Sequence, residues 1–393
     1  MASDILTLNA GSSSLKFSLW HFVTATELQE IFRGEIEKIG IAPNLSVRGP
    51  GSAVVLSRGF DDGSAKLTHE DLLRELFGWL SRQRSYELKG VGHRVVHGGA
   101  DFTAPVRVDD QVIEKLRQLE PLAPLHQPHN LSGIRTCAML RPHVPQVACF
   151  DTAFHRTMDS LARRLGLPRD YQAEGVQRYG FHGLSYEFIA EQLRAIDPGL
   201  AHGRVIVAHL GNGASLCAMR DGRSVDTTMS FTALDGLLMG TRPGTLDPGA
   251  VTYLMREHGM SVSEIEEVLY HRSGLLGISG ISSDMRTLLA SDDPHAREAV
   301  ELFVFRATRE IGALTASMGG LDGLVFTAGI GEHASEIRSR ICARCARLGV
   351  VLDEHANRTG KMRITTGASG IRVYVIPTDE ERMIAAHTIK HVG

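Results

Sequence analysis

The sequence has no long uninterrupted apolar segment, since no run approaches the ~18–20 residues that a membrane-spanning helix needs. Residues 1–17 carry an acid near their start and a serine-rich stretch soon after. They therefore lack the basic and then apolar regions that define a signal peptide. We expect a soluble cytoplasmic protein without a membrane partner.

Cysteine is scarce, and neither sign of charge is in large excess. The five cysteines among 393 residues are odd in number and scattered, which fits a reducing compartment better than a disulfide framework. The formal net charge of −3 argues against a nucleic-acid partner, whose recognition depends on neutralising phosphates. Linkers and low-complexity segments are also absent, so any domain boundary must be a compact hinge.

Two segments about half the chain apart resemble each other. Residues 5–20 and 205–219 each contain an apolar strand, a turn of Gly, Ser or Asn, and a second apolar strand. This pattern predicts two β-hairpins. Since strand-like and helical sequence follows each of them, we predict a duplicated α/β domain, within the two or three domains that this length allows.

Helical spacing of apolar residues is clear in six places. The capping pair Thr68 and Asp71 precedes the first of these. The predicted helices cover 69–80, 110–119, 184–196, 298–318, 335–349 and 379–392.

The turn of the first hairpin, NAGSSSLK (9–16), is a candidate phosphate site. Its glycine permits a tight turn, and its three hydroxyls can donate to phosphate oxygens. Lys16 alternates with apolar Leu15 and Phe17, so it points to the opposite face of the strand. The spacing is not that of a P-loop. A polar hairpin tip with a solvated lysine is an equal alternative.

The segment GHRVVHGG (92–99) places Arg94 among apolar residues before a Gly-Gly turn. Arginine is the preferred partner of carboxylates and phosphates. His93 and His97 have the spacing of a helical zinc motif, but the valines favour a strand and Arg94 replaces the motif's glutamate, so we reject zinc. A buried arginine–carboxylate pair is the alternative interpretation.

The segment 121–130, PLAPLHQPHN, contains several prolines and two histidines, including His126. Proline excludes regular helix and central strand. We expect either a binding loop or a structural turn here, without preference.

Asp151 directly follows the strand-like sequence VPQVACF (144–150). The carboxyl end of a strand is where α/β proteins place magnesium ligands and catalytic acids. We favour that interpretation over a helix cap, which aspartate also suits.

Glycine-rich loops dominate the second half of the chain. Two of them, RYGFHG (178–183) and MGTRPGTLDPG (239–249), present His182 and Arg242. A lone loop histidine is more often structural than catalytic. Three more turns let backbone amides approach phosphates: AHLGNG (208–213), SGISSDMR (279–286) and FTAGIGE (326–332). Most charged candidates lie in the first half, so we predict a nucleotide cleft between the halves.

Taken in order, these motifs resemble the acetate kinase (acetokinase) family over nearly the whole chain. The series consists of NAGSSSLK, GHRVVHGG, FDTAFH, RYGFHG, AHLGNGAS, MGTR, SGISSDMR, FTAGIGE and PTDEE (377–381). The resemblance implies the actin/sugar-kinase/Hsp70 fold: α/β, with two related actin-like (ribonuclease H-like) domains and a nucleotide cleft between them. The implied domains are 1–151 plus 382–393, and 152–381.

The resemblance also implies chemistry: reversible transfer of a phosphoryl group from ATP to acetate by a homodimer that requires Mg2+, with Mn2+ as a substitute. Asp151 would be the catalytic carboxylate, near acetate. Arg94 and Arg242 would clamp acetate and the moving phosphoryl group, which His182 would stabilise. Lys16 would face the phosphates.

Further binding residues follow from the same resemblance. The metal would be held by Asn9 and Glu380. The acetate pocket would be lined by Arg94, Val96, Leu125, His126, Phe181 and Ala233. The nucleotide and its phosphates would contact Ser12, Ser14, Lys16, His209, Asn212, Gly213, Asp284, Arg286, Gly329, Ile330 and Gly331.

The sequence departs from the family pattern at Ala233, where a proline usually lines the pocket for the acetate methyl group. His333 stands where asparagine is common. The first change makes a kinase for propionate or another short-chain carboxylate the main alternative. A nucleotide-dependent conformational protein of the actin type, and a binding subunit without turnover, are further alternatives. The clamp of two arginines argues against both.

Overall fold

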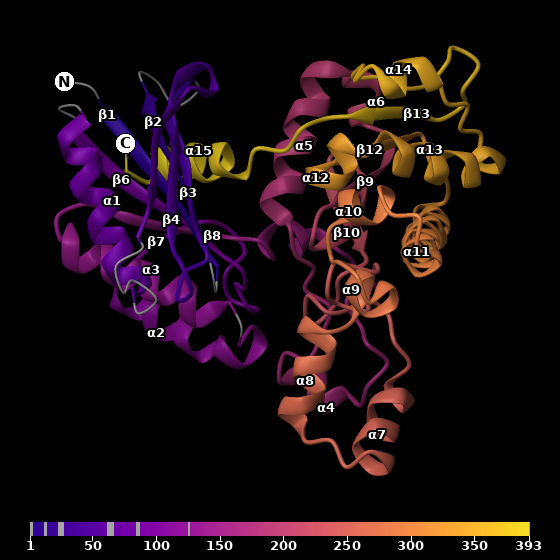
Figure 1. Ribbon diagram of the computed structural model, residues 1–393, viewed down its shortest axis with the longest axis horizontal. Helices are drawn as coiled ribbons and strands as arrows, with labels where there is room; N and C mark the ends of the chain where they lie inside the picture. Colours follow the sequence, from indigo (N-terminus) through magenta and orange to yellow (C-terminus); the bar gives the residue numbers. More distant parts are fainter. Residues whose placement is uncertain are drawn as a thin grey trace. The chain divides into compact units, whose positions relative to one another are not determined.

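The computed structural model describes residues 3–11, 14–22, 27–60, 67–83, 87–124 and 126–392. The chain divides into two compact units (Figure 1). Unit 1 is Met1–Phe154 with Asp379–Gly393, and unit 2 is His155–Thr378. The chain passes from unit 1 to unit 2 after Phe154 and returns to unit 1 after Thr378. The boundaries expected from the sequence fall after residues 151 and 381.

Unit 1 is built on an eight-stranded mixed sheet with the order β5-β4-β3-β2-β1-β6-β8-β7. Strands β1 to β5 form an antiparallel meander, and β1, β6 and β8 run parallel to one another. The strands are β1 (Ser3–Ala10), β2 (Leu15–Phe22), β3 (Leu28–Glu37), β4 (Asn44–Arg48), β5 (Val54–Gly59), β6 (Glu87–Val95), β7 (Val106–Arg107) and β8 (Gln146–Phe150).

Helices of unit 1 cover this sheet. They are α1 (His69–Gln83), α2 (Asp110–Gln118), α3 (Gln127–Leu140) and α15 (Glu380–Val392). The capping box before α1 is confirmed, because Thr68 N donates to Asp71 Oδ2 (2.9 Å) and Asp71 N donates to Thr68 Oγ1 (3.3 Å). Trp79 of α1 packs edge-on against Phe32 of β3.

The C-terminal helix α15 packs on the first strands of the chain (Figure 1). Ala385 and Ile389 form a buried cluster with Ile5 and Trp20. Gly92 on β6 makes this close packing feasible, since a Cβ there would lie 2.2 Å from Thr388 Oγ1. The packing brings the start of α15, at Glu380, to the carboxyl end of the parallel strands.

Unit 2 contains a five-stranded sheet with the order β11-β10-β9-β12-β13. Its strands are β9 (Arg204–Leu210), β10 (Ala214–Arg220), β11 (Arg223–Thr227), β12 (Gly323–Thr327) and β13 (Arg372–Val375). Its helices are α4 (Arg169–Ala173), α5 (Gly183–Ile196), α6 (Pro198–Ala201), α7 (Pro248–Glu257), α8 (Val262–His271), α9 (Gly274–Ser279), α10 (Met285–Leu289), α11 (Pro294–Met318), α12 (Ala328–His333), α13 (Ser335–Arg344) and α14 (Glu354–Arg358).

The two sheets share one topology. In unit 2 an antiparallel meander of three strands continues into two parallel strands, as β3-β2-β1-β6-β8 does in unit 1. The predicted hairpins occupy equivalent places, with β1–β2 in one unit and β9–β10 in the other. The duplicated α/β architecture is therefore confirmed, and the repeated five-strand core is the actin-like, ribonuclease H-like arrangement.

One prediction of local structure was wrong. The segment 121–130 was expected to exclude helix, but helix α3 begins within it at Gln127. Pro128 occupies the first turn of α3, where the missing N–H costs nothing because the first amides of a helix have no intrahelical partner. No helix among the described residues is long and apolar enough to cross a membrane.

Candidate active site

Asp151 lies where the sequence predicts it, one residue beyond the buried strand β8. Its backbone amide donates to Val95 O (3.1 Å), so the ends of β8 and β6 are held together. The side chain is fully buried, and both carboxylate oxygens accept hydrogen bonds from Arg94. The Asp151 carboxylate therefore forms an ion pair with Arg94 at the ends of β6 and β8.

Arg94 reaches Asp151 with two nitrogens, from Nε to Oδ1 (3.0 Å) and from Nη2 to Oδ2 (2.5 Å). Its third nitrogen, Nη1, donates to Asn9 Oδ1 at the end of β1 (3.1 Å). Burial opposes the guanidinium charge, but Asp151 and Glu380 outweigh it and raise the pKa of Arg94. The arginine–carboxylate pair that the sequence left as an alternative is thus present.

A second carboxylate, Glu380, completes this cluster from the first position of α15. Its Oε2 lies 3.8 Å from Arg94 Nε. The pKa of Glu380 is raised to about 7, because burial, together with the charge of Asp151, raises it more than Arg94 lowers it. Two carboxylates, Asp151 and Glu380, therefore share the single guanidinium of Arg94, with Lys16 as a further positive charge near Glu380.

The donors of this cluster fit magnesium. Asn9 and Glu380 offer amide and carboxylate oxygens, which are the hard ligands that Mg2+ prefers. In the part of the chain that the structure describes, no group of three or more His, Cys, Asp or Glu could hold a metal ion. Mg2+ in proteins usually keeps several waters and is bound through one or two carboxylates together with substrate phosphates.

Lys16 lies beside the cluster in the sheet. It pairs with Asn9 across the β1–β2 hairpin, and it is exposed between buried Leu15 and Phe17, as predicted. In the hairpin turn, Gly11 N donates to Ser14 O (2.8 Å). Of the other predicted contacts, Ser12 and Leu125 lie outside the described residues.

In unit 2, His182 caps helix α5 in the left-handed conformation, with φ 57°. Its Nδ1 hydrogen-bonds Ser215 Oγ (2.8 Å), which in turn bonds the hydroxyl of Tyr186. The ring stacks on that of His209, with centroids 4.1 Å apart and planes at 14°. These contacts orient the imidazole, so His182 is more than an ordinary loop histidine.

Gly213 lies next to this histidine, and the end of the Arg242 side chain lies next to Gly213. Arg242 Nη1 donates to Ala233 O (2.7 Å). A Cβ at Gly213 would lie 2.7 Å from Arg242 Nη2 and 3.5 Å from His182 Nε2, so a larger residue in this turn would displace the end of the Arg242 side chain. Four residues predicted from separate motifs, namely His182, Gly213, Ala233 and Arg242, thus form one cluster.

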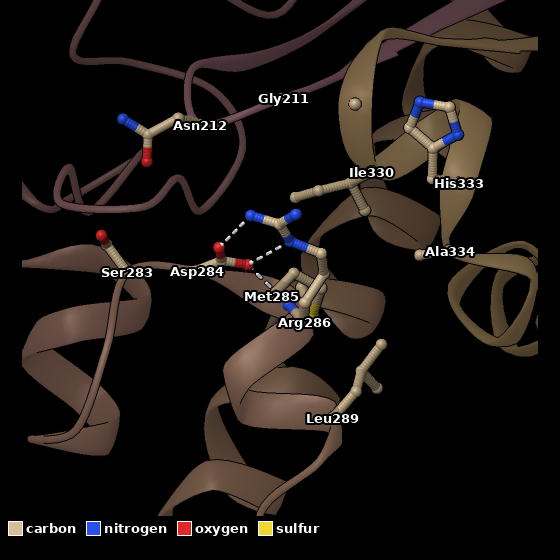
Figure 2. Close-up of a pocket in the computed structure, with 11 residues that line it drawn as sticks. Gly211, Asn212, Ser283, Asp284, Met285, Arg286, Leu289, Ile330, His333 and Ala334 are labelled. Atoms are coloured by element: carbon tan, nitrogen blue, oxygen red, sulfur yellow. Dashed lines mark hydrogen bonds and ion pairs between the residues drawn. The ribbon is translucent and has the colours of Figure 1, made fainter. Parts of the chain in front are cut away.

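A cavity of about 600 Å³ lies within unit 2. This volume suits a small organic ligand such as a nucleotide. Figure 2 shows Asn212 and Ser283 on one side of the cavity, Ile330, His333 and Ala334 on the other, and Arg286 between them. The lining consists of Gly211, Asn212, Ser283, Asp284, Met285, Arg286, Leu289, Gly329, Ile330, His333 and Ala334.

Five predicted nucleotide residues line the cavity: Asn212, Asp284, Arg286, Gly329 and Ile330. Asp284 caps α10 and forms an ion pair with Arg286 (2.7 Å between Oδ2 and Nη2), which sets the direction of the guanidinium (Figure 2).

Three predicted residues, His209, Gly213 and Gly331, are not among those that line the cavity. Gly331 is buried, and its carbonyl accepts from Arg338 Nη1 (2.9 Å). Two apolar lining residues, Met285 and Leu289, were not predicted from the sequence. Their i, i+4 spacing on one short helix was the available signal.

The predicted substrate residues are distributed over both units. In unit 1, Val96 N donates to Asn130 Oδ1 (3.0 Å), and His126 is the residue that precedes α3. In unit 2, Phe181 is buried and its carbonyl accepts from His155 Nε2 (2.9 Å).

Two actin-like units define the class of this protein, a two-domain α/β protein of the actin-like fold. The chain belongs to the acetokinase family, whose sequence model matches residues 4–386.

Relatives of similar length support this assignment. The chain is 53% identical over 392 residues to the acetate kinase of Rhodopseudomonas palustris, covering 98% of each chain. It is 48% identical over 388 residues to that of Rhizobium meliloti, covering 98% of this chain and 97% of the relative.

Solved structures agree. A propionate kinase from Francisella tularensis is 37% identical with a TM-score of 0.91, covering 99% of this chain and 100% of its own. An acetate kinase from Porphyromonas gingivalis is 35% identical with a TM-score of 0.88, covering 100% of both chains.

Proposed function

We propose that this protein is an acetate kinase, which transfers a phosphoryl group reversibly between ATP and acetate to give ADP and acetyl phosphate. The observation that carries the proposal is the Arg94–Asp151 pair at the strand ends, beside Asn9 and Glu380. It supplies a guanidinium for a carboxylate substrate together with oxygen ligands for a cation.

The proposed reaction is direct in-line transfer. One acetate oxygen attacks the γ-phosphorus of ATP, and the bond from that phosphorus to the bridging oxygen breaks, leaving its electron pair on ADP. A carboxylate is already nucleophilic at neutral pH, so a strong base is not required. The main obstacle is the approach of one anion to another, which positioning and compensating charge relieve.

Each side chain has a proposed part in this transfer. Arg94 binds the acetate carboxylate, and Asp151 fixes the direction of its guanidinium. In unit 2, Arg242 and the Nε2 edge of His182 face the transferring phosphoryl group, a role supported by their shared contact with Gly213. Lys16 binds phosphate oxygens.

The cofactor and nucleotide have proposed positions as well. Mg2+, held by Asn9 and Glu380, would neutralise phosphate charge when bound. The adenosine part of ATP occupies the cavity of unit 2, between Asn212 and Ile330. We further propose that the protein is a cytoplasmic homodimer.

A second candidate is a propionate kinase. Ala233 favours it, because alanine is smaller than the proline common in the family and would leave room for another methylene. A propionate kinase is also among the similar structures.

A coupled assay with ATP, Mg2+ and a panel of formate, acetate, propionate and butyrate tests both proposals. The highest kcat/KM identifies the substrate. Turnover with none of these carboxylates would refute the kinase assignment.

A further inference from the structure

The chain passes from unit 2 back to unit 1 at the peptide between Thr378 and Asp379. Asp379 is held in unit 1, where its Oδ1 accepts from Arg33 Nη2 (2.8 Å) and from Arg382 N (3.2 Å) in the first turn of α15. The next residue, Glu380, is the carboxylate beside Arg94. The start of α15 is therefore held within unit 1 by Arg33 and Arg94.

The backbone of Thr378 is tied to the nucleotide cavity. Glu332 Oε1 accepts hydrogen bonds from Thr378 N (3.1 Å) and from Ala328 N (2.8 Å). Ala328 has φ 63°, a left-handed conformation that is costly for a residue with a side chain. It begins α12, which forms one wall of the cavity. One carboxylate oxygen thus holds both a strained turn of the wall and the last residue of unit 2.

The side chain of Thr378 is tied to the stacked histidines. Its Oγ1 hydrogen-bonds Ser185 Oγ (2.8 Å), and Ser185 Oγ bonds His209 Nδ1 (2.8 Å). His209 stacks on His182. Ser185 is fully buried, so this link is sheltered from water.

We propose that Thr378 is a positioning residue that joins the nucleotide wall of unit 2 to the His209–His182 stack. The inference rests on the proposed kinase function. The amide of Thr378 is linked to α12 through Glu332, and its hydroxyl is linked to His209 through Ser185.

Thr378→Val tests the hydroxyl, because valine keeps the shape and the backbone amide. Loss of one such hydrogen bond predicts a kcat about 5- to 10-fold lower, with the Kd for ADP, measured by calorimetry, unchanged within about twofold. Thr378→Ser should restore kcat. Thr308→Val is the matched control, since Thr308 is half-buried and bonds only its own helix at Val304 O (2.8 Å).

A double-mutant cycle tests whether Thr378 acts through its hydrogen bond to Ser185. Thr378→Val and Ser185→Ala remove the same bond, so their effects on kcat should be less than additive when combined. Glu332→Ala frees both amides, so it should weaken ADP binding and lower kcat together. Its control is Glu336→Ala on the exposed side of α13.

The inference is overturned if Thr378→Val has the kcat of Thr308→Val, or if the effects of Thr378→Val and Ser185→Ala add fully. A readout independent of turnover is the ¹⁵N NMR signal of His209 Nδ1. It should shift in Thr378→Val and Ser185→Ala but not in Thr308→Val. If the natural protein phosphorylates no short carboxylate, the proposed function fails, and the NMR comparison alone decides whether Thr378 is linked to His209.

Discussion

Arg94 and Asp151 face each other as a two-point ion pair, with Nε–Oδ1 at 3.0 Å and Nη2–Oδ2 at 2.5 Å. The carboxylate is fully buried, so loss of Arg94 would leave the charge of Asp151 out of water and without this partner. Variants of this pair can therefore distinguish the contribution of the residues to the free energy of unfolding from their contribution to turnover.

Arg94→Met should destabilise the fold by about 3–5 kcal/mol, because it leaves the Asp151 charge buried and unpaired. It should also lower kcat/KM by about 10²–10³-fold, as expected when one charge at a reacting centre is lost. The double variant Arg94→Met/Asp151→Asn should regain much of the stability without regaining activity. Urea unfolding together with the coupled assay measures both quantities. A double variant that stays as unstable as the single one would contradict the paired-charge explanation.

Gly213→Ala should impair catalysis without unfolding the protein. The added methyl group would lie 2.7 Å from Arg242 Nη2, so the guanidinium must move away from its place beside residue 213. We expect kcat to fall by about 10²-fold, since misplaced groups at a reacting centre carry costs of this size. Gly312→Ala, on the exposed face of α11 with nothing within 4 Å of the new methyl, is the control. Equal kcat values for the two variants would show that Arg242 is not held in a critical position.

Ile330→Ala should weaken nucleotide binding selectively. Ile330 lines the cavity in unit 2, and truncation removes three carbon atoms of apolar contact. At ~0.8 kcal/mol per buried methylene, the KM for ATP should rise by about 10- to 50-fold. The KM for acetate should change little. A change confined to the KM for acetate would place the nucleotide elsewhere.

Acid should destabilise the protein through three buried histidines. Burial lowers the pKa of His93, His97 and His155 to about 4, from the usual 6.5. The unfolded chain binds these protons from pH 6.5 downward while the folded protein does not, so stability falls between pH 6.5 and 4. Each histidine contributes up to ~1.4 kcal/mol per pH unit in that window.

His93→Gln should reduce this slope by close to one proton, because glutamine cannot bind a proton but can still hydrogen-bond Gln146, the present partner of His93 Nε2 (2.7 Å). Urea unfolding at several pH values measures the slope. An unchanged slope would mean that His93 is already protonated in the folded protein.

Ala233→Pro should narrow the acyl pocket and shift preference towards acetate. One extra substrate methylene is worth ~0.8 kcal/mol in transfer terms, or about fourfold. We therefore expect the natural protein to use propionate measurably, and the propionate-to-acetate ratio of kcat/KM to fall by up to about fourfold in the variant. The same ratio in both proteins would show that the size of residue 233 does not set the substrate preference.

Local pattern was enough to predict the regular elements. The hairpins at 5–20 and 205–219 and the helix that follows Thr68 were predicted correctly, because alternation, helical spacing and capping act over a few residues. The duplicated fold could be inferred from the two hairpins and from the strand-like and helical sequence that follows each of them. Proline was over-interpreted in 121–130, since its cost depends on its position in the helix and Pro128 lies in the first turn.

The sequence by itself determined which residue types stand at the strand ends and glycine turns. Only the tertiary structure decided which of them meet. Arg94 pairs with Asp151, 57 residues away, and Thr378 bonds Ser185, 193 residues away. Such contacts leave no periodic signal, because they depend on the strand order that brings β6 beside β8 and on the packing of buried side chains. The stacking of His209 on His182 has the same cause: a hairpin strand and a helix start meet only after the sheet has formed.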